Sequence, residues 1–170
     1  LGLALQRSVQ MLDRRIVVHR HVLPDDDDAA IAAAILRPPY RCQGLVITAR
    51  DTEPVREALR TVIGRGVPVV TMVTDIGGVE RLHYAGIDNY RGGRTAGYFL
   101  GRFGPRRGRV LLLCSRSDYR AHADRAAGCR DVIASDFPLL RCEAGNVETH
   151  DDPDRCYLAV INALKHGGPV

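Results

Sequence analysis

Short apolar runs alternate with amphipathic stretches along the whole chain. The runs are bounded by glycine, proline or charged residues and predict buried strands. Apolar residues spaced three and four apart predict helices, each with one apolar face. The predicted strands are residues 16–22, 44–48, 67–73, 82–87, 109–114 and 139–143. The predicted helices are residues 1–14, 29–36, 53–63, 89–103, 120–135 and 153–166.

This order of elements indicates an α/β fold. Strands that alternate with helices and are apolar on both faces are typical of a Rossmann-like parallel sheet flanked by helices on both sides. No strand precedes the first helix, and only two strand–helix units follow residue 103. We therefore expect one nearly complete lobe, residues 1–90, whose first strand is missing, and a partial second lobe, residues 91–170. The alternative is a single doubly wound domain of the flavodoxin type.

The stretch Tyr84–Phe103 changes from a strand to a helix in its middle. Asp88 or Asn89 can cap this helix by accepting hydrogen bonds from its first N–H groups. Gly92 and Gly93 allow another group to approach the backbone closely. In an open α/β sheet, small ligands bind where a strand turns into a helix. A well-capped turn without a ligand is the alternative. The helix carries one apolar face, which we expect to face the core: Ala96, Phe99, Leu100 and Phe103.

The composition is that of an ordinary globular protein. Of the 170 residues, 45% are apolar and 26% are charged, and the net charge is +4. No run of about 18 apolar residues occurs, so we expect no membrane contact, and we expect no signal peptide at the start. Arginines are dense only in Arg102–Arg109, which is typical of a solvated turn rather than of a nucleic-acid surface. Five cysteines without a C-x-x-C pair favour free thiols in the cytoplasm.

The motifs of common enzyme classes are missing from the sequence. It has no G-x-x-x-x-G-K-[ST] phosphate loop, no G-x-G-x-x-G fingerprint and no G-x-S-x-G nucleophile elbow. The six histidines form no H-x-x-x-H pair, so we expect no metal and no cofactor. The predicted carboxyl ends of the strands carry hydroxyl, carboxylate and guanidinium groups, at residues 48–51, 73–75, 88–89 and 115–118. Such groups suit a neutral polyol, so we expect binding rather than catalysis.

The segment G-I-D-N-x-x-G-G-R-T-A, residues 86–96, resembles the crossover segment of LacI-type transcriptional regulators and related periplasmic sugar-binding proteins. The resemblance covers residues 43–147 and is strongest over residues 68–130. It implies a fold of two Rossmann-like lobes, with the first crossover between them at this segment. It also implies a small-molecule effector, most simply a sugar, that binds between the lobes.

The resemblance further implies which residues hold the ligand. Arg125 stands in S-R-S-D-Y-R-A-H-A-D-R-A-A-G, which is similar to the family's strand–loop–helix ending in R-x-x-G-[FW], whose arginine holds sugar hydroxyls. Cys129 stands where the family has an aromatic residue. The other candidate ligand-binding residues are Tyr119, His122, Arg91, Asp75 and Asp88. Without the resemblance, Arg125 and Arg91 would be interpreted as solvated arginines on helices.

These observations lead to one main function and two alternatives. The main expectation is the ligand-sensing domain of a cytoplasmic LacI-type repressor that binds a sugar or a related polar metabolite. The family implies a homodimer, and contact with operator DNA through a helix-turn-helix that these residues do not include. The first alternative is a periplasmic sugar-binding protein of a transporter, which shares the fold. The second is an α/β enzyme acting on a sugar phosphate, for which a phosphate loop and a nucleophile–base pair are missing.

Overall fold

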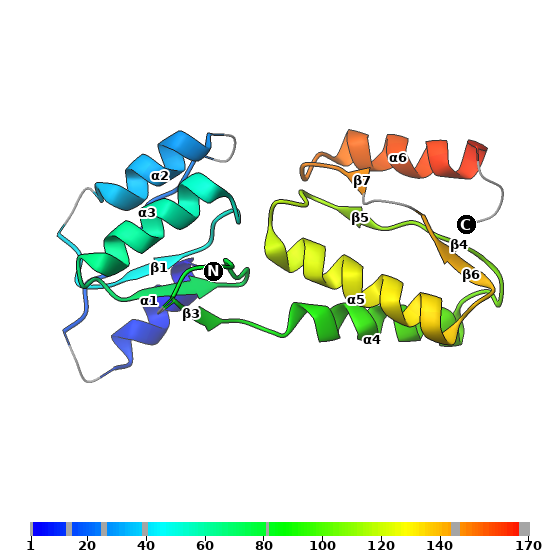
Figure 1. Ribbon diagram of the computed structural model, residues 1–170, viewed down its shortest axis with the longest axis horizontal. Helices are drawn as coiled ribbons and strands as arrows, with labels where there is room; N and C mark the ends of the chain where they lie inside the picture. Colours follow the sequence, from blue (N-terminus) through cyan, green and yellow to red (C-terminus); the bar gives the residue numbers. More distant parts are fainter. Residues whose placement is uncertain are drawn as a thin grey trace.

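The computed structural model describes residues 2–12, 15–24, 27–38, 41–80, 82–143 and 147–166 (Figure 1). Its helices are α1 (Gly2–Gln10), α2 (Asp28–Leu36), α3 (Glu53–Gly64), α4 (Asn89–Phe103), α5 (Arg120–Asp136) and α6 (Pro153–His166). Its strands are β1 (Leu45–Ile47), β2 (Val69–Met72), β3 (Leu82–Ala85), β4 (Gly108–Val110), β5 (Leu113–Cys114), β6 (Leu140–Cys142) and β7 (Val147–Glu148). The predicted α/β class, with parallel sheets flanked by helices, is confirmed.

The first sheet has the order β1-β2-β3, and both of its ladders are parallel. Val46 pairs with Val70, and Thr71 pairs with Tyr84. Because the strands run in the same direction, their carboxyl ends meet at one edge of the sheet. The segments that follow β1, β2 and β3 therefore lie at a common edge, as the sequence predicted.

Helices α2 and α3 cover one face of this sheet (Figure 1). Their buried side chains pack against those of β1 and β2, and Leu59 and Val55 of α3 and Val69 of β2 are fully buried. Pro54 in the first turn of α3 is compatible with a helix start because its missing N–H would have no partner there. This packing makes the first sheet and its two helices the main core of the described chain.

The strand predicted at residues 16–22 is wrong, since residues 15–24 form neither strand nor helix. Val17 is 76% exposed, and α1 buries no residue. An isolated apolar run cannot be a strand without a neighbouring strand to pair with. The second face of the sheet is therefore covered less than predicted, and Val46 points outward there as an exposed side chain.

The later strands form two short parallel pairs, β4 with β6 and β5 with β7. The strand predicted at residues 109–114 is divided into β4 and β5, but the backbone bonds from Glu143 N to Val110 O and from Val147 N to Leu112 O continue the pairing between them. Within the described ranges these strands pair only with one another and not with β1–β3. Strand β7 was not predicted.

Helices α4 and α5 pack closely through glycine residues. A Cβ added to Gly93 would overlap the carbonyl oxygen of Arg125, and one added to Gly97 would lie 2.8 Å from the carbonyl oxygen of Cys129. From the other side, a Cβ on Gly128 would overlap the carbonyl oxygen of Tyr90. The two backbones approach one another so closely because these positions carry no side chain.

The apolar face predicted to bury α4 is instead exposed. Its residues Ala96, Phe99, Leu100 and Phe103 all lie at the surface, and Phe103 is 76% exposed. The buried face carries Asn89, Gly93 and Gly97. The prediction failed because glycine adds nothing to an apolar pattern, although a row of glycines makes the face that another helix can approach most closely.

Candidate functional site

Helices α4 and α5 both begin at the end that faces the first sheet (Figure 1). The Nε atom of Arg125 in α5 donates a hydrogen bond to Oδ1 of Asn89, the first residue of α4, at 2.8 Å. Among the described residues this is the single hydrogen bond or ion pair of the Arg125 side chain. Its two terminal nitrogens are therefore left to bind another group.

Asn89 is buried, with 6% of its surface exposed, and joins several segments at this edge. Its Nδ2 atom lies 3.0 Å from the hydroxyl of Tyr84 in β3 and 3.4 Å from the carbonyl oxygen of Val73 after β2. The Tyr84 hydroxyl also lies 2.9 Å from the Ile87 carbonyl oxygen, to which it can donate. Asn89 thus fixes the crossover and orients Arg125. Sequence reasoning placed Asn89 at a strand end and considered it as a helix cap, but not as the partner of Arg125.

Asp88 is the residue that caps α4, with its Oδ1 accepting from the backbone N–H of Arg91 at 2.9 Å. The Arg91 side chain is 84% exposed and returns to Asp88, with its Nε 3.3 Å from Oδ2. These two predicted ligand contacts therefore lie together at the start of α4, and each already partners the other. The cap itself was predicted correctly.

Tyr119 and His122 lie together at the start of α5, with ring centroids 5.8 Å apart. The Nδ1 atom of His122 is 2.9 Å from the carbonyl oxygen of Arg116, which fixes the ring against the preceding loop. Both side chains are half-buried. They form a wall on the same helix that carries Arg125.

The loop before α5 reaches the carboxyl ends of β1 and β2. The backbone N–H of Asp51 donates to the carbonyl oxygen of Asp118 at 2.8 Å. The backbone N–H of Ala121 donates to Oγ1 of the buried Thr74 at 3.1 Å. These two bonds join segments far apart in the sequence, at the edge where the polar residues were predicted to gather.

A buried arginine strengthens this junction. Arg50, with 4% of its surface exposed, follows β1 and forms ion pairs with Asp28 of α2 and with Asp118, the latter at 3.3 Å. Partial burial of Asp118 raises its pKa, but the hydrogen bond and charge of Arg116, together with Arg50, outweigh that effect and hold the pKa of Asp118 below its ordinary value. Asp118 is therefore ionised at neutral pH. The position of Arg50 directly after an apolar strand was the sequence signal from which a buried ion pair could have been predicted.

Asp75 also follows a strand at the carboxyl edge of the first sheet, but its hydrogen bonds are to residues close to it in the sequence. Its Oδ1 accepts from Oγ1 of Thr71 at 3.1 Å and from the backbone N–H of Ile76 at 2.8 Å. The carboxylate retains lone pairs for a further donor, because each oxygen can accept more than one hydrogen bond. No direct bond links Asp75 to the group around Arg125 in the described residues.

The arrangement provides hydrogen-bond donors, hydrogen-bond acceptors and an aromatic wall. In the residues described, no three His, Cys, Asp or Glu side chains gather as they would around a metal ion. The described helices include none that is both long enough and apolar enough to cross a membrane. A fixed guanidinium beside oriented amides and carboxylates is a typical arrangement for binding the hydroxyls of a polar ligand.

Three of the solved structures that share this fold are described as binding a sugar or as in complex with one. GanP, a glucose-galactose binding protein from Geobacillus stearothermophilus, is 23% identical with a TM-score of 0.68, and the match covers 82% of this chain and 47% of GanP. A solute-binding protein of an ABC transporter from Burkholderia graminis, in complex with D-arabinose, is 18% identical with a TM-score of 0.76. The match covers 88% of this chain and 52% of that protein. The fructose-binding periplasmic domain of a hybrid two-component system is 19% identical with a TM-score of 0.73. The match covers 85% of this chain and 48% of that domain.

At these identities the likeness shows the fold, and this chain spans about half the length of these structures. A comparison with curated protein sequences gave no match. The family model of the periplasmic binding protein domain matches residues 26–170, which is most of the chain. The predicted resemblance is thereby confirmed for the periplasmic binding protein domain, and a LacI-type regulator stays a prediction. The chain belongs to the periplasmic binding protein domain family.

Proposed function

We propose that this chain contributes a binding site for a sugar or a closely related polyol. The observation that carries the proposal is the Arg125 guanidinium, which Asn89 holds through Nε while its terminal nitrogens have no partner among the described residues. A planar fork held in this way can donate to two neighbouring hydroxyls of one sugar ring. The proposal is supported by the family and by the sugars named for relatives of the same fold.

The other candidate contacts follow from their place around Arg125. Tyr119 and His122 would form the wall against which the apolar face of a sugar ring packs. Asp75 would accept from a hydroxyl on the side of the first sheet. Asp88 and Arg91 would contribute at the rim, where each would have to exchange its present partner for the ligand.

We propose that the ligand lies between two lobes, residues 1–90 and 91–170, of which the second is partial. The separate pairing of β1–β3 and of β4–β7 supports this division. The bonds from Asp51 to Asp118 and from Ala121 to Thr74 would then hold the lobes together beside the ligand. Closure of two lobes on a ligand is a common form of domain motion in binding proteins.

Two roles are compatible with sugar binding, and each has one observation in its favour. Two of the solved relatives are described as sugar- or solute-binding proteins of ABC transporters, which favours a solute receptor. All five cysteines are free thiols, which favours a reducing compartment and hence the sensing domain of a cytoplasmic LacI-type repressor that forms homodimers. Neither role involves catalysis, so we propose a binding protein and not an enzyme.

The two roles are separated by the complete gene and its product. An encoded helix-turn-helix, with sugar-dependent retardation of operator DNA in a mobility-shift assay, would select the repressor. A signal peptide, with recovery of the protein from the periplasmic fraction, would select the transporter receptor. Failure of the gene product to bind any sugar in calorimetry would reject both.

A further inference from the structure

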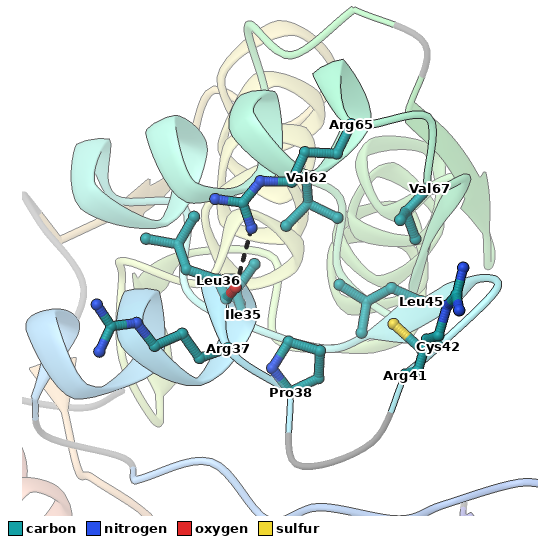
Figure 2. Close-up of a pocket in the computed structure, with 10 residues that line it drawn as sticks. All are labelled: Ile35, Leu36, Arg37, Pro38, Arg41, Cys42, Leu45, Val62, Arg65 and Val67. Atoms are coloured by element: carbon teal, nitrogen blue, oxygen red, sulfur yellow. Dashed lines mark hydrogen bonds between the residues drawn. The ribbon is translucent and has the colours of Figure 1, made fainter.

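A pocket of about 350 Å³ lies at the amino end of the first sheet (Figure 2). It is formed where α2 and α3 end and where the chain enters β1 and β2. The proposed sugar site lies at the carboxyl ends of the same strands. The two sites are therefore at opposite ends of the sheet.

The floor of the pocket is apolar. Ile35 and Val62 belong to the first core, and Leu45 and Val67 pack against it. A group that enters the pocket therefore meets hydrocarbon, and its own apolar surface would leave water on binding. The volume is at the lower end of the range of about 300–1,000 Å³ that is common for small-molecule sites. A single ring or a branched alkyl group is of suitable size.

Among the described residues that line the pocket, the rim carries three arginines and no acidic side chain: Arg37, Arg41 and Arg65 (Figure 2). Arg65 is held in place by a hydrogen bond from Nη1 to the carbonyl oxygen of Leu36 at 3.0 Å. In the described part of the chain, the side chains of Arg37 and Arg41 make no hydrogen bond or ion pair. Two of the three guanidinium groups are therefore available to an incoming anion.

The local charge favours an anion even after the helix ends are included. Helices α2 and α3 both end at the pocket, after Leu36 and Gly64. Each helix end contributes roughly half a negative charge. Three guanidinium groups outweigh two such ends by about two positive charges. The arginines thus exceed what is needed to balance the helix dipoles.

We propose that this pocket binds an organic anion with a small apolar group, such as an aromatic or a branched aliphatic carboxylate. The apolar group occupies the floor beside Ile35 and Val62, and the carboxylate meets Arg41 at the rim. An inorganic anion would interact only with the arginines of the rim, and an uncharged hydrocarbon would contact only the apolar floor. The ligand therefore needs both parts.

Benzoate is the probe, and binding is measured with the chain as it stands by NMR titration of the backbone amides. We expect a Kd on the order of 1 mM, as suits so small a ligand. The shifts should concentrate at Leu36, Arg37 and Cys42. Benzamide, which lacks the charge, and acetate, which lacks the ring, should each bind at least about 10-fold more weakly.

Arg41→Gln is the test variant, because Arg41 lies outside the helices and its side chain supports no bond in the described residues. It should weaken benzoate binding about 5-fold to 10-fold. Arg102→Gln, at the end of α4, removes the same charge away from the pocket and should leave the affinity unchanged. Equal binding of benzamide and benzoate, equal weakening by both variants, or no shift at the pocket would each overturn the proposal.

Discussion

The Nε atom of Arg125 donates a hydrogen bond to Oδ1 of Asn89 across a distance of 2.8 Å, joining α5 to the first residue of α4. Asn89 in turn lies within hydrogen-bonding distance of Tyr84 and Val73 in the first sheet region. One buried amide therefore positions the proposed sugar contact and fixes the crossover. The function of Arg125 and the local structure around Asn89 are coupled for this reason.

Replacing Asn89 with alanine should destabilise the fold. The change leaves the Val73 carbonyl and the Arg125 guanidinium without this partner, and a lost buried hydrogen bond costs about 1–3 kcal/mol. Urea unfolding followed by circular dichroism measures the change. Asn162→Ala, at an exposed position of α6, is the control and should stay within about 0.5 kcal/mol of the wild type. Equal effects of the two substitutions would contradict the role of Asn89.

The two adjacent glycines of α4 should respond to alanine in opposite ways. Gly93→Ala forces a methyl group onto the Arg125 carbonyl and should destabilise the protein by about 1–3 kcal/mol. At Gly92 an added Cβ meets only Ile87 Cδ1, at 3.7 Å. Gly92→Ala should therefore stabilise the helix by about 0.5–1 kcal/mol. Thermal unfolding of both variants checks the contrast, and a neutral Gly93→Ala would argue against the close α4–α5 contact.

The fold was largely predictable because its local signals agree with one another. Asp88 supplied a capping signal that the structure confirms, and the apolar runs at β1 and β2 marked strands that are central to the core. The errors arose where a residue acts through distant partners. The apolar run around Val17 predicts a strand but has no neighbouring strand to pair with. In α4 the buried face is the one that carries the glycines, and the apolar face that ends at Phe103 is exposed.

The candidate site was predictable only in outline. Polar residues were placed correctly at the carboxyl ends of the strands, but which of them bond one another depends on segments far apart in sequence. The ion pair between Arg50 and Asp118 spans 68 positions, and the bond between Arg125 and Asn89 spans 36. Spacing along the chain carries no information about such pairs, so the role of Asn89 as a support for Arg125 became visible only in three dimensions.

The junction at Asp118 should make stability depend on acid pH. The pKa of Asp118 is lower in the folded protein than its ordinary value of 3.8, because Arg116 and Arg50 favour the carboxylate. The stabilisation is therefore complete above about pH 5 and is lost as the pH falls through the folded pKa, below 3.8. Asp118→Asn should cost about 1–2 kcal/mol at pH 7 and much less at pH 3. Urea unfolding at the two pH values measures this difference, and a cost independent of pH would contradict it.

The exposed aromatic residues of α4 should promote self-association. Phe99 and Phe103 stack with centroids 5.6 Å apart, and both are exposed. The homodimer proposed above would bury such a surface. Multi-angle light scattering should show a dimer at high protein concentration, and Phe103→Glu should shift it toward the monomer. A wild-type protein that stays monomeric at every concentration would contradict the proposed dimer.

The most direct test of the central claim is calorimetry of the complete gene product with glucose, galactose, D-arabinose and fructose. Wild type is compared with Arg125→Ala and with Arg102→Ala, an exposed arginine at the end of α4. We expect that at least one sugar binds, that Arg125→Ala weakens its binding about 10-fold to 100-fold, and that Arg102→Ala leaves its binding unchanged. Equal affinities of the two variants, or a wild type that binds none of the sugars, would contradict it.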